Sequence, residues 1–223
     1  WGRDHHDFDA VLAPPGLPPL DAVALDLPGF GVAPPPPEPW GSAEYAASVA
    51  HVLSDMAVPI VVLGHSFGGR VALHLAARWP DAVRGLVLTG VPFFAPPGRP
   101  RRSPMAFRAI RRLHRLHLLG DHRIEAARQR YGSSDYRAAR GVMRQVLVRV
   151  LAERYDAQLA AINCPTILVW GDDDTTAPVS VAEEAATRLR RGELRRIDGG
   201  DHLLPRSAPE SLRQAVLDNL GSP

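Results

Sequence analysis

Several features that would indicate other classes of protein are missing from this 223-residue sequence. A single cysteine, Cys164, permits no internal disulfide, so a reducing compartment and a cytoplasmic location are the default expectation. No apolar run approaches the roughly 20 residues that a helix needs to cross a membrane, and no signal peptide or internal repeat is visible. With 45% apolar residues, the chain can instead bury the core of one globular domain.

Lysine is also missing, because all 26 basic residues are arginine. Fifteen of them lie between Arg99 and Arg154, where only four acids occur. This basic region could attract anionic substrates or an anionic surface, or it could be a solvated helical face in a chain from an arginine-favouring genome. No recognition motif accompanies the arginines, so nucleic-acid binding is not predicted. Histidines cluster at His114, His117 and His122 without a recognisable ligand set, so no metal site is predicted either.

The most informative segment is Val61-Val62-Leu63-Gly64-His65-Ser66-Phe67-Gly68-Gly69, in which an apolar strand runs into Gly-x-Ser-x-Gly and then a helix. This is the layout of a nucleophile elbow, which holds a serine at a strained turn on the carboxyl edge of a sheet. We expect side chains at both flanking glycines, Gly64 and Gly68, to collide there. The amide of Phe67 then faces any oxyanion formed beside Ser66. A glycine-rich turn that carries a serine by chance is the alternative.

Two later strands are also followed by titratable residues. The apolar run 166–170 is followed by three successive aspartates, Asp172 to Asp174, and a further strand at 194–197 is followed by His202. Because each candidate follows a strand, all three are expected at the same edge of a parallel sheet. A serine can act as the nucleophile, a histidine as the base that activates it, and an acid as the group that orients the histidine.

With serine, acid and histidine in this order along the chain, the sequence resembles the α/β-hydrolase superfamily. The chymotrypsin and subtilisin types of serine hydrolase have the three residues in other orders. The resemblance extends from the Asp26-Leu27-Pro28-Gly29-Phe30-Gly31 loop to His202 and covers nearly the whole chain. It implies a mostly parallel sheet flanked by helices, with His202 as base. It also implies that the acid is Asp174, which lies four residues after Trp170 and four before Pro178, as in the family's pattern.

The family's second oxyanion donor lies just after a His-Gly pair that closes an early strand, and this chain has no such pair. Its first residues, Trp1-Gly2-Arg3-Asp4, resemble the segment directly after His-Gly in these enzymes, and no initiator methionine precedes them. We therefore expect the sequence to be truncated, with at least one central strand missing, and Trp1 to be the second oxyanion donor. The alternative is that the chain is processed and complete.

Strand and helix patterns alternate over much of the chain, which predicts a parallel sheet covered on both faces. Strands are expected at residues 22–27, 60–64, 85–89, 166–170 and 194–197. Helices are expected from an N-cap at Ser42 to about Met56, after the elbow until Pro80, and at residues 181–190 and 209–220. Residues 33–39 contain five prolines and should form a stiff surface loop.

Between Pro92 and Ile162 the alternation breaks and the pattern is largely helical. α/β-hydrolases carry a lid at this place, so we expect residues 95–160 to form a helical cap and residues 1–94 and 161–223 to form the core. The cap could exclude water and provide apolar walls for substrate, or its apolar residues could only attach it to the core. These residues are Met105, Phe107, Ile110, Leu113, Leu116, Met143 and Leu147.

The resemblance implies acyl transfer from a small ester-like substrate through a covalent intermediate on Ser66, with His202 as base and Asp174 orienting it. A carboxylesterase-like reaction is expected, and it needs no cofactor. Relatives also cleave amides, lactones or carbon–carbon bonds or run perhydrolysis, and a ligand-binding member without activity is a further alternative. The oligomeric state is left open.

Overall fold

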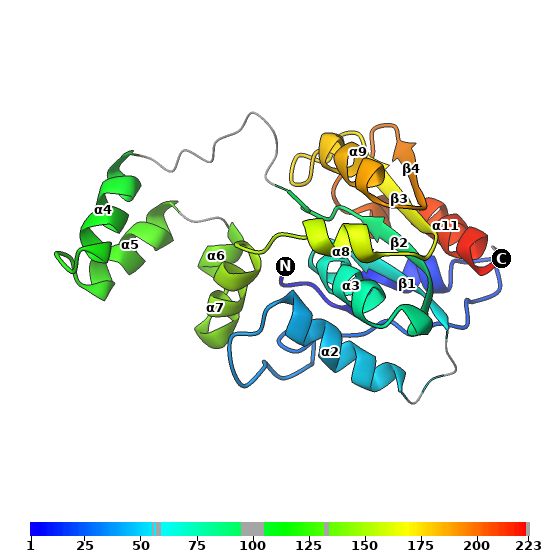
Figure 1. Ribbon diagram of the computed structural model, residues 1–223, viewed down its shortest axis with the longest axis horizontal. Helices are drawn as coiled ribbons and strands as arrows, with labels where there is room; N and C mark the ends of the chain where they lie inside the picture. Colours follow the sequence, from blue (N-terminus) through cyan, green and yellow to red (C-terminus); the bar gives the residue numbers. More distant parts are fainter. Residues whose placement is uncertain (55, 57–58, 95–104, 132–133, 222–223) are drawn as a thin grey trace.

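The computed structural model describes residues 1–54, 56, 59–94, 105–131 and 134–221 (Figure 1). Its centre is a parallel sheet in the order β1-β2-β3-β4, and each neighbouring pair of strands is parallel. The strands are β1 (Ile60–His65), β2 (Val83–Thr89), β3 (Thr166–Gly171) and β4 (Gly192–Ile197). Four of the five predicted strands are thereby confirmed, each to within two residues at either end.

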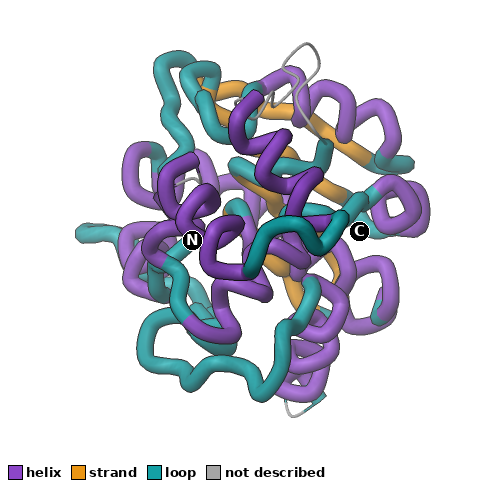
Figure 2. The backbone as a smooth tube through the Cα atoms, turned by 90° about the vertical axis from the view of Figure 1, so that its left-hand side faces the viewer, coloured by secondary structure: helices purple, strands orange, loops and turns teal. Residues whose placement is uncertain are grey.

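Helices connect the strands and cover both faces of the sheet, as Figures 1 and 2 show. α3 (Phe67–Arg78) joins β1 to β2 and is followed by the short turn η2 (Pro80–Ala82), so the predicted stop at Pro80 is confirmed. α9 (Val179–Arg188) joins β3 to β4, and α10 (Leu204–Ser207) and α11 (Pro209–Gly221) follow β4. Because each crossover returns the chain to the same end of the sheet, the strands' carboxyl ends all lie at one edge.

The period of two along each strand divides the core into two parts. In β2, Leu86 and Leu88 pack in the cluster that includes residues of α2 (Ser42–Leu53), α3 and α9. Val87, between them, packs in a second cluster with residues of α1 (Asp9–Leu12) and α11. All three side chains are fully buried. The continuous apolar sequence of β2 therefore reflects a strand that is covered on both faces.

Residues 22–27 form no strand, so that prediction is wrong. Within the described part of the chain, β1 pairs with β2 alone, and the segment has no ladder to join. Val23 and Leu25, which lie in the mostly apolar sequence of this segment, are exposed. An apolar segment by itself does not form a strand without a partner that accepts the backbone hydrogen bonds.

The N-terminus of α2 differs from the prediction in one detail. Gly41 is the N-cap and Ser42 is the first helical residue. A carboxylate oxygen of Glu44 accepts a hydrogen bond of 3.0 Å from the Gly41 amide, which is the side-chain half of a capping box. The helix ends at Leu53, three residues before the expected end at Met56.

The insertion between β2 and β3 contains helices, as its pattern predicts: α4 (Met105–Arg115), α5 (Asp121–Tyr131), α6 (Ser134–Ala138), α7 (Gly141–Val150) and α8 (Asp156–Ala161). α4 and α5 lie beside each other, apart from the sheet, whereas α8 lies against α3 (Figure 1). Val146 and Val150 of α7 are buried in the same cluster as residues of α3. Leu113 and Leu116 are exposed, Leu147 is buried, and the side chains of Met105 and Phe107 lie outside the described residues. The division into core and cap remains a prediction.

Candidate functional site

Ser66 occupies the turn between β1 and α3 in a strained conformation. Its φ is 49° and its ψ is −112°, a region that residues with a side chain rarely adopt. The Ser66 amide donates a hydrogen bond of 2.9 Å to the carbonyl of Thr89, the last residue of β2. This bond fixes the turn to the neighbouring strand, as the elbow motif predicts.

The crowded glycines of the elbow are Gly64 and Gly69. A Cβ atom on Gly64 would lie 2.6 Å from the Gly69 Cα, and one on Gly69 would lie 2.2 Å from the Val91 Cγ2. A Cβ on Gly68 would meet no non-neighbouring atom within 4 Å. The expected collision at Gly64 is confirmed, but the one at Gly68 is wrong, because in this turn α3 approaches the sheet at the next residue.

Asp174 is the aspartate that contacts His202. Its Oδ2 lies 2.7 Å from the His202 Nδ1, and its Oδ1 accepts hydrogen bonds of 2.8 Å from the amides of Thr176 and Ala177. Asp174 is buried. Because an ionised carboxylate only accepts hydrogen bonds, this arrangement assigns the proton to Nδ1 and leaves Nε2 as the basic nitrogen of the ring.

The two neighbouring aspartates make different contacts. Asp172 accepts a hydrogen bond of 2.7 Å from the Arg196 Nε, and Asp173 is exposed. Of the three aspartates, Asp174 is thus the one placed in hydrogen-bond contact with His202, and its catalytic role remains a prediction.

Close backbone contact brings the loops after β3 and β4 together. A Cβ on Gly171 would lie 2.2 Å from the carbonyl oxygen of Gly200, so neither glycine leaves room for a side chain. The Asp173 amide donates to the same Gly200 carbonyl at 2.9 Å. The Trp170 indole then donates to the Ala177 carbonyl at 2.7 Å, which fixes the far end of the acid-bearing loop.

His65 joins the elbow to the histidine loop. Its Nε2 donates a hydrogen bond of 2.8 Å to the carbonyl of His202, which requires the proton on Nε2. Desolvation of the buried ring lowers the pKa of His65 to about 4. His65 is therefore neutral at physiological pH.

Gly90, the residue directly after β2, adjoins the His202 ring. It has a φ of 60°, and a Cβ there would lie 3.0 Å from both Cε1 and Nδ1 of the ring. Since the preceding carbonyl, that of Thr89, accepts the Ser66 amide, Ser66 and His202 adjoin the same end of β2. Sequence reasoning did not identify Gly90 as a site residue.

An aromatic cluster lies beside Ser66. The Phe67 ring is 5.6 Å from that of Trp1, 5.4 Å from that of Phe30 and 5.0 Å from that of Tyr45, measured between centroids. The side chains of Phe67 and Trp1, the two residues expected to provide oxyanion donors, are thus in contact. Phe30 and Tyr45 were not predicted as site residues, although Phe30 lies in the loop that carries the family resemblance.

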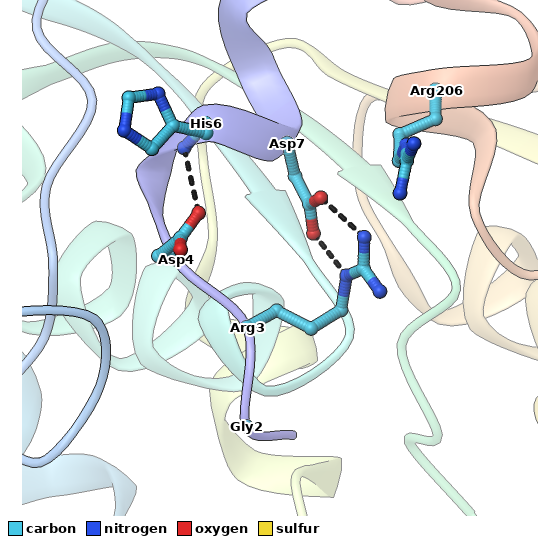
Figure 3. Close-up of a pocket in the computed structure, with 6 residues that line it drawn as sticks. All are labelled: Gly2, Arg3, Asp4, His6, Asp7 and Arg206. Atoms are coloured by element: carbon cyan, nitrogen blue, oxygen red, sulfur yellow. Dashed lines mark hydrogen bonds and ion pairs between the residues drawn. The ribbon is translucent and has the colours of Figure 1, made fainter.

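A separate polar pocket of about 400 Å³ lies at the N-terminal segment. Figure 3 shows its lining: Gly2, Arg3, Asp4, His6, Asp7 and Arg206. Arg3 and Asp7 form an ion pair within it, and the hydrogen bonds from Arg3 lower the pKa of Asp7. Neither Ser66 nor Asp174 nor His202 lines this pocket.

The described residues contain no group of three or more His, Cys, Asp or Glu side chains that could hold a metal ion. His5 and His6 instead each lie 3.0 Å from a carboxylate, that of Asp26 and that of Asp9. Over the same part of the chain, no helix has the length and apolar character needed to cross a bilayer.

Comparison with known proteins gives consistent matches. A model described as the alpha/beta hydrolase family matches residues 1–215. The pimeloyl-(acyl-carrier protein) methyl ester esterase of Neisseria meningitidis serogroup B (strain H44/76) is 35% identical over 216 residues, which cover 87% of this chain and 80% of that protein. The enzyme of the same name from Aromatoleum aromaticum is 30% identical over a match that covers 98% of this chain and 94% of that enzyme. A thermophilic esterase structure from Thermogutta terrifontis has a TM-score of 0.67 at 24% identity, covering 97% of this chain and 85% of that one.

Proposed function

We propose a catalytic mechanism for this chain, which belongs to the alpha/beta hydrolase family and is a carboxylesterase-like hydrolase acting on ester substrates. The observation that carries the mechanism is the hydrogen bond of 2.7 Å between Asp174 and His202, at the sheet edge where Ser66 occupies a strained turn. A buried carboxylate, an oriented imidazole and a serine at an elbow are the parts that nucleophilic acyl transfer needs.

In this mechanism the Ser66 hydroxyl attacks the ester carbonyl carbon while His202 Nε2 takes its proton. His202 then gives a proton to the departing alcohol, which leaves an acyl group on Ser66. Water, deprotonated by the same nitrogen, releases the acid and restores the serine. Asp174 holds the proton on Nδ1 and stabilises the imidazolium that forms in both steps.

The negative charge that develops on the carbonyl oxygen needs hydrogen-bond donors. The amide of Phe67 is the first of these in the proposal, and it lies in the first turn of α3, where the helix dipole also favours negative charge. Trp1, whose ring packs against that of Phe67, provides the second. Each donor of this kind is typically worth about 3 kcal/mol of transition-state stabilisation.

The substrate class in the proposal is a small carboxylic ester. The aromatic cluster of Trp1, Phe30 and Phe67 gives an apolar wall next to the nucleophile. Such a wall suits an apolar acyl chain better than an acyl chain that carries a charge. The relatives named as methyl ester esterases make methyl esters of aliphatic acids the first natural-type substrates to test.

The test is labelling with a fluorophosphonate probe, followed by identification of the modified residue, together with hydrolysis of p-nitrophenyl acetate and of methyl octanoate. We expect the label on Ser66, and we expect Ser66→Ala to abolish both labelling and hydrolysis while the melting temperature stays close to that of the wild type. Ser54→Ala, at the exposed serine directly after α2, is the matched control and should retain activity. Hydrolysis that survives Ser66→Ala would exclude this mechanism, and a wild type that is neither labelled nor active would indicate a ligand-binding member of the fold.

A further inference from the structure

Arg70 is a buried charged residue that the proposed mechanism does not use. It lies in α3, four residues after Ser66, and is 7% exposed. Its Nη1 donates a hydrogen bond of 2.8 Å to the carbonyl of Val150, and its Nη2 donates one of 3.1 Å to the carbonyl of Pro92. Pro92 precedes the insertion and Val150 is the last residue of α7, so one guanidinium holds both chain segments at the base of the insertion.

The chemistry of these contacts favours arginine over other residues. The last carbonyls of a helix have no partner within the helix, and the end of α7 carries partial negative charge from the helix dipole. A guanidinium satisfies such a carbonyl and reaches a second acceptor with another arm of the same rigid plane, which an ammonium cannot reproduce. The Tyr155 ring covers the group, with its centroid 5.4 Å from the Arg70 Cζ.

The residues that follow Val150 are attached to the core beside this point. Oε1 of Glu153 accepts a hydrogen bond of 2.9 Å from the Ser42 amide at the start of α2, and Oε2 accepts one of 2.7 Å from the Tyr155 hydroxyl. Negative charge at a helix N-terminus is favourable, so Glu153 stabilises α2 as well as its own segment. The C-terminal end of α7 is therefore fixed to the elbow helix through Arg70 and to α2 through Glu153.

The other end of α7 contacts the aromatic cluster. Met143 is so close to the loop after residue 27 that a Cβ on Gly29 would lie 2.2 Å from its sulfur. Leu147 is buried in a small cluster against which Trp1 packs. Since Trp1 in turn packs against Phe67, the position of α7 determines the shape of the apolar wall beside Ser66.

We propose that Arg70 is a positioning residue that fixes α7 relative to Ser66 and thereby sets how well the site accepts long acyl chains. The selectivity part of this proposal rests on Ser66 being the nucleophile of an esterase. Without the guanidinium, the Pro92 carbonyl loses this donor and the Val150 carbonyl keeps only the Glu153 amide, at 3.2 Å. α7 then shifts, while the elbow and the Asp174–His202 pair keep their own contacts. A long acyl chain that reaches α7 then loses contacts, whereas an acetyl group does not extend that far.

The experiment compares Arg70→Met and Arg70→Lys with the wild type. The control is Arg78→Met in the same helix, where the exposed guanidinium lies over the Trp79 ring at 5.0 Å. Two readouts are measured: kcat and KM for p-nitrophenyl acetate and octanoate, and hydrogen exchange of the amides of α7.

For Arg70→Met we expect KM for the octanoate to rise about tenfold, kcat for the acetate to stay within about twofold, and α7 to exchange at least about tenfold faster. For Arg70→Lys, both the KM for the octanoate and the exchange rate of α7 should lie between those of the wild type and Arg70→Met, because lysine keeps the charge but loses the two-armed guanidinium. A parallel loss on both esters, or α7 exchange equal to that of Arg78→Met, would overturn the proposal. If Arg70→Met does not fold, Arg70→Lys decides by the same two criteria. A wild type inactive on both esters refutes the selectivity role together with the esterase mechanism, whereas the exchange of α7 still shows whether Arg70 holds it.

Discussion

Replacement of His65 by glutamine should change the pH dependence of stability more than stability itself. His65 is neutral in the folded protein because desolvation lowers its pKa to about 4, against 6.5 for an unperturbed histidine. The Nε2 of glutamine can occupy the place of the His65 Nε2 and donate to the same His202 carbonyl. The variant thus removes the titration and keeps the hydrogen bond.

The sign and size follow from proton linkage. The unfolded chain binds a proton at His65 below about pH 6.5, while the folded chain resists it down to about pH 4, so stability from this group falls as the pH drops through that window. Between pH 8 and pH 5 the two pKa values give a loss of about 2 kcal/mol in the wild type, as an upper figure, and none in His65→Gln. Below pH 4 no further loss comes from this residue.

The measurement is urea unfolding of both proteins at several pH values between 8 and 5. Other titrating groups are common to both proteins, so their effects cancel in the difference between the two free energies of unfolding. We expect the variant to be close to the wild type or less stable at pH 8 and to gain about 2 kcal/mol relative to it by pH 5. Parallel curves over this range would show that His65 has no lowered pKa.

Two further predictions concern the acid and the elbow. Asp174→Asn should reduce kcat by about four orders of magnitude, since only the residue on the His202 Nδ1 sets the tautomer, whereas Asp172→Asn loses an ion pair with Arg196 and little activity; equal losses in kcat/KM would show that the acid is assigned wrongly. Gly69→Ala should lower the free energy of unfolding by about 1–3 kcal/mol, because its Cβ would meet Val91, while Gly68→Ala should lie within about 1 kcal/mol of the wild type or above it; urea unfolding with equal results for the two variants would contradict the geometry of the turn.

The sheet was predictable because its signals are local. A strand covered on both faces needs a continuous apolar run, and the runs that form β2 and β3 are bounded at their start by Pro80 and Pro165. The segment 22–27 has a comparable pattern but forms no strand, because pairing depends on a neighbour elsewhere in the chain. A pattern along one segment carries no information about its partner.

The candidate site divides in the same way. Ser66, Asp174 and His202 are marked by short spacings around strand ends, and these spacings are visible in the sequence. The contacts of Arg70 and Gly90 are not, because they join residues that are distant in the chain. The Gly-x-Ser-x-Gly pattern predicts a steric conflict for a side chain at Gly68, but the structure has this conflict at Gly69. The pattern records residue types and not the direction in which the backbone turns.

The carboxyl end of β2 and the residues after it organise each part of the site. The Thr89 carbonyl accepts the Ser66 amide, Gly90 adjoins the His202 ring, Val91 packs on Gly69, and the Pro92 carbonyl accepts Arg70. Four successive residues thus contact the turn that holds Ser66, the His202 ring and the Arg70 guanidinium, although none of the four has a proposed catalytic role. A parallel sheet makes this possible because neighbouring strands end together. The same arrangement explains why a substitution in this short segment should alter reactivity and substrate access together, whereas Asp174 and Arg70 each affect only one of them.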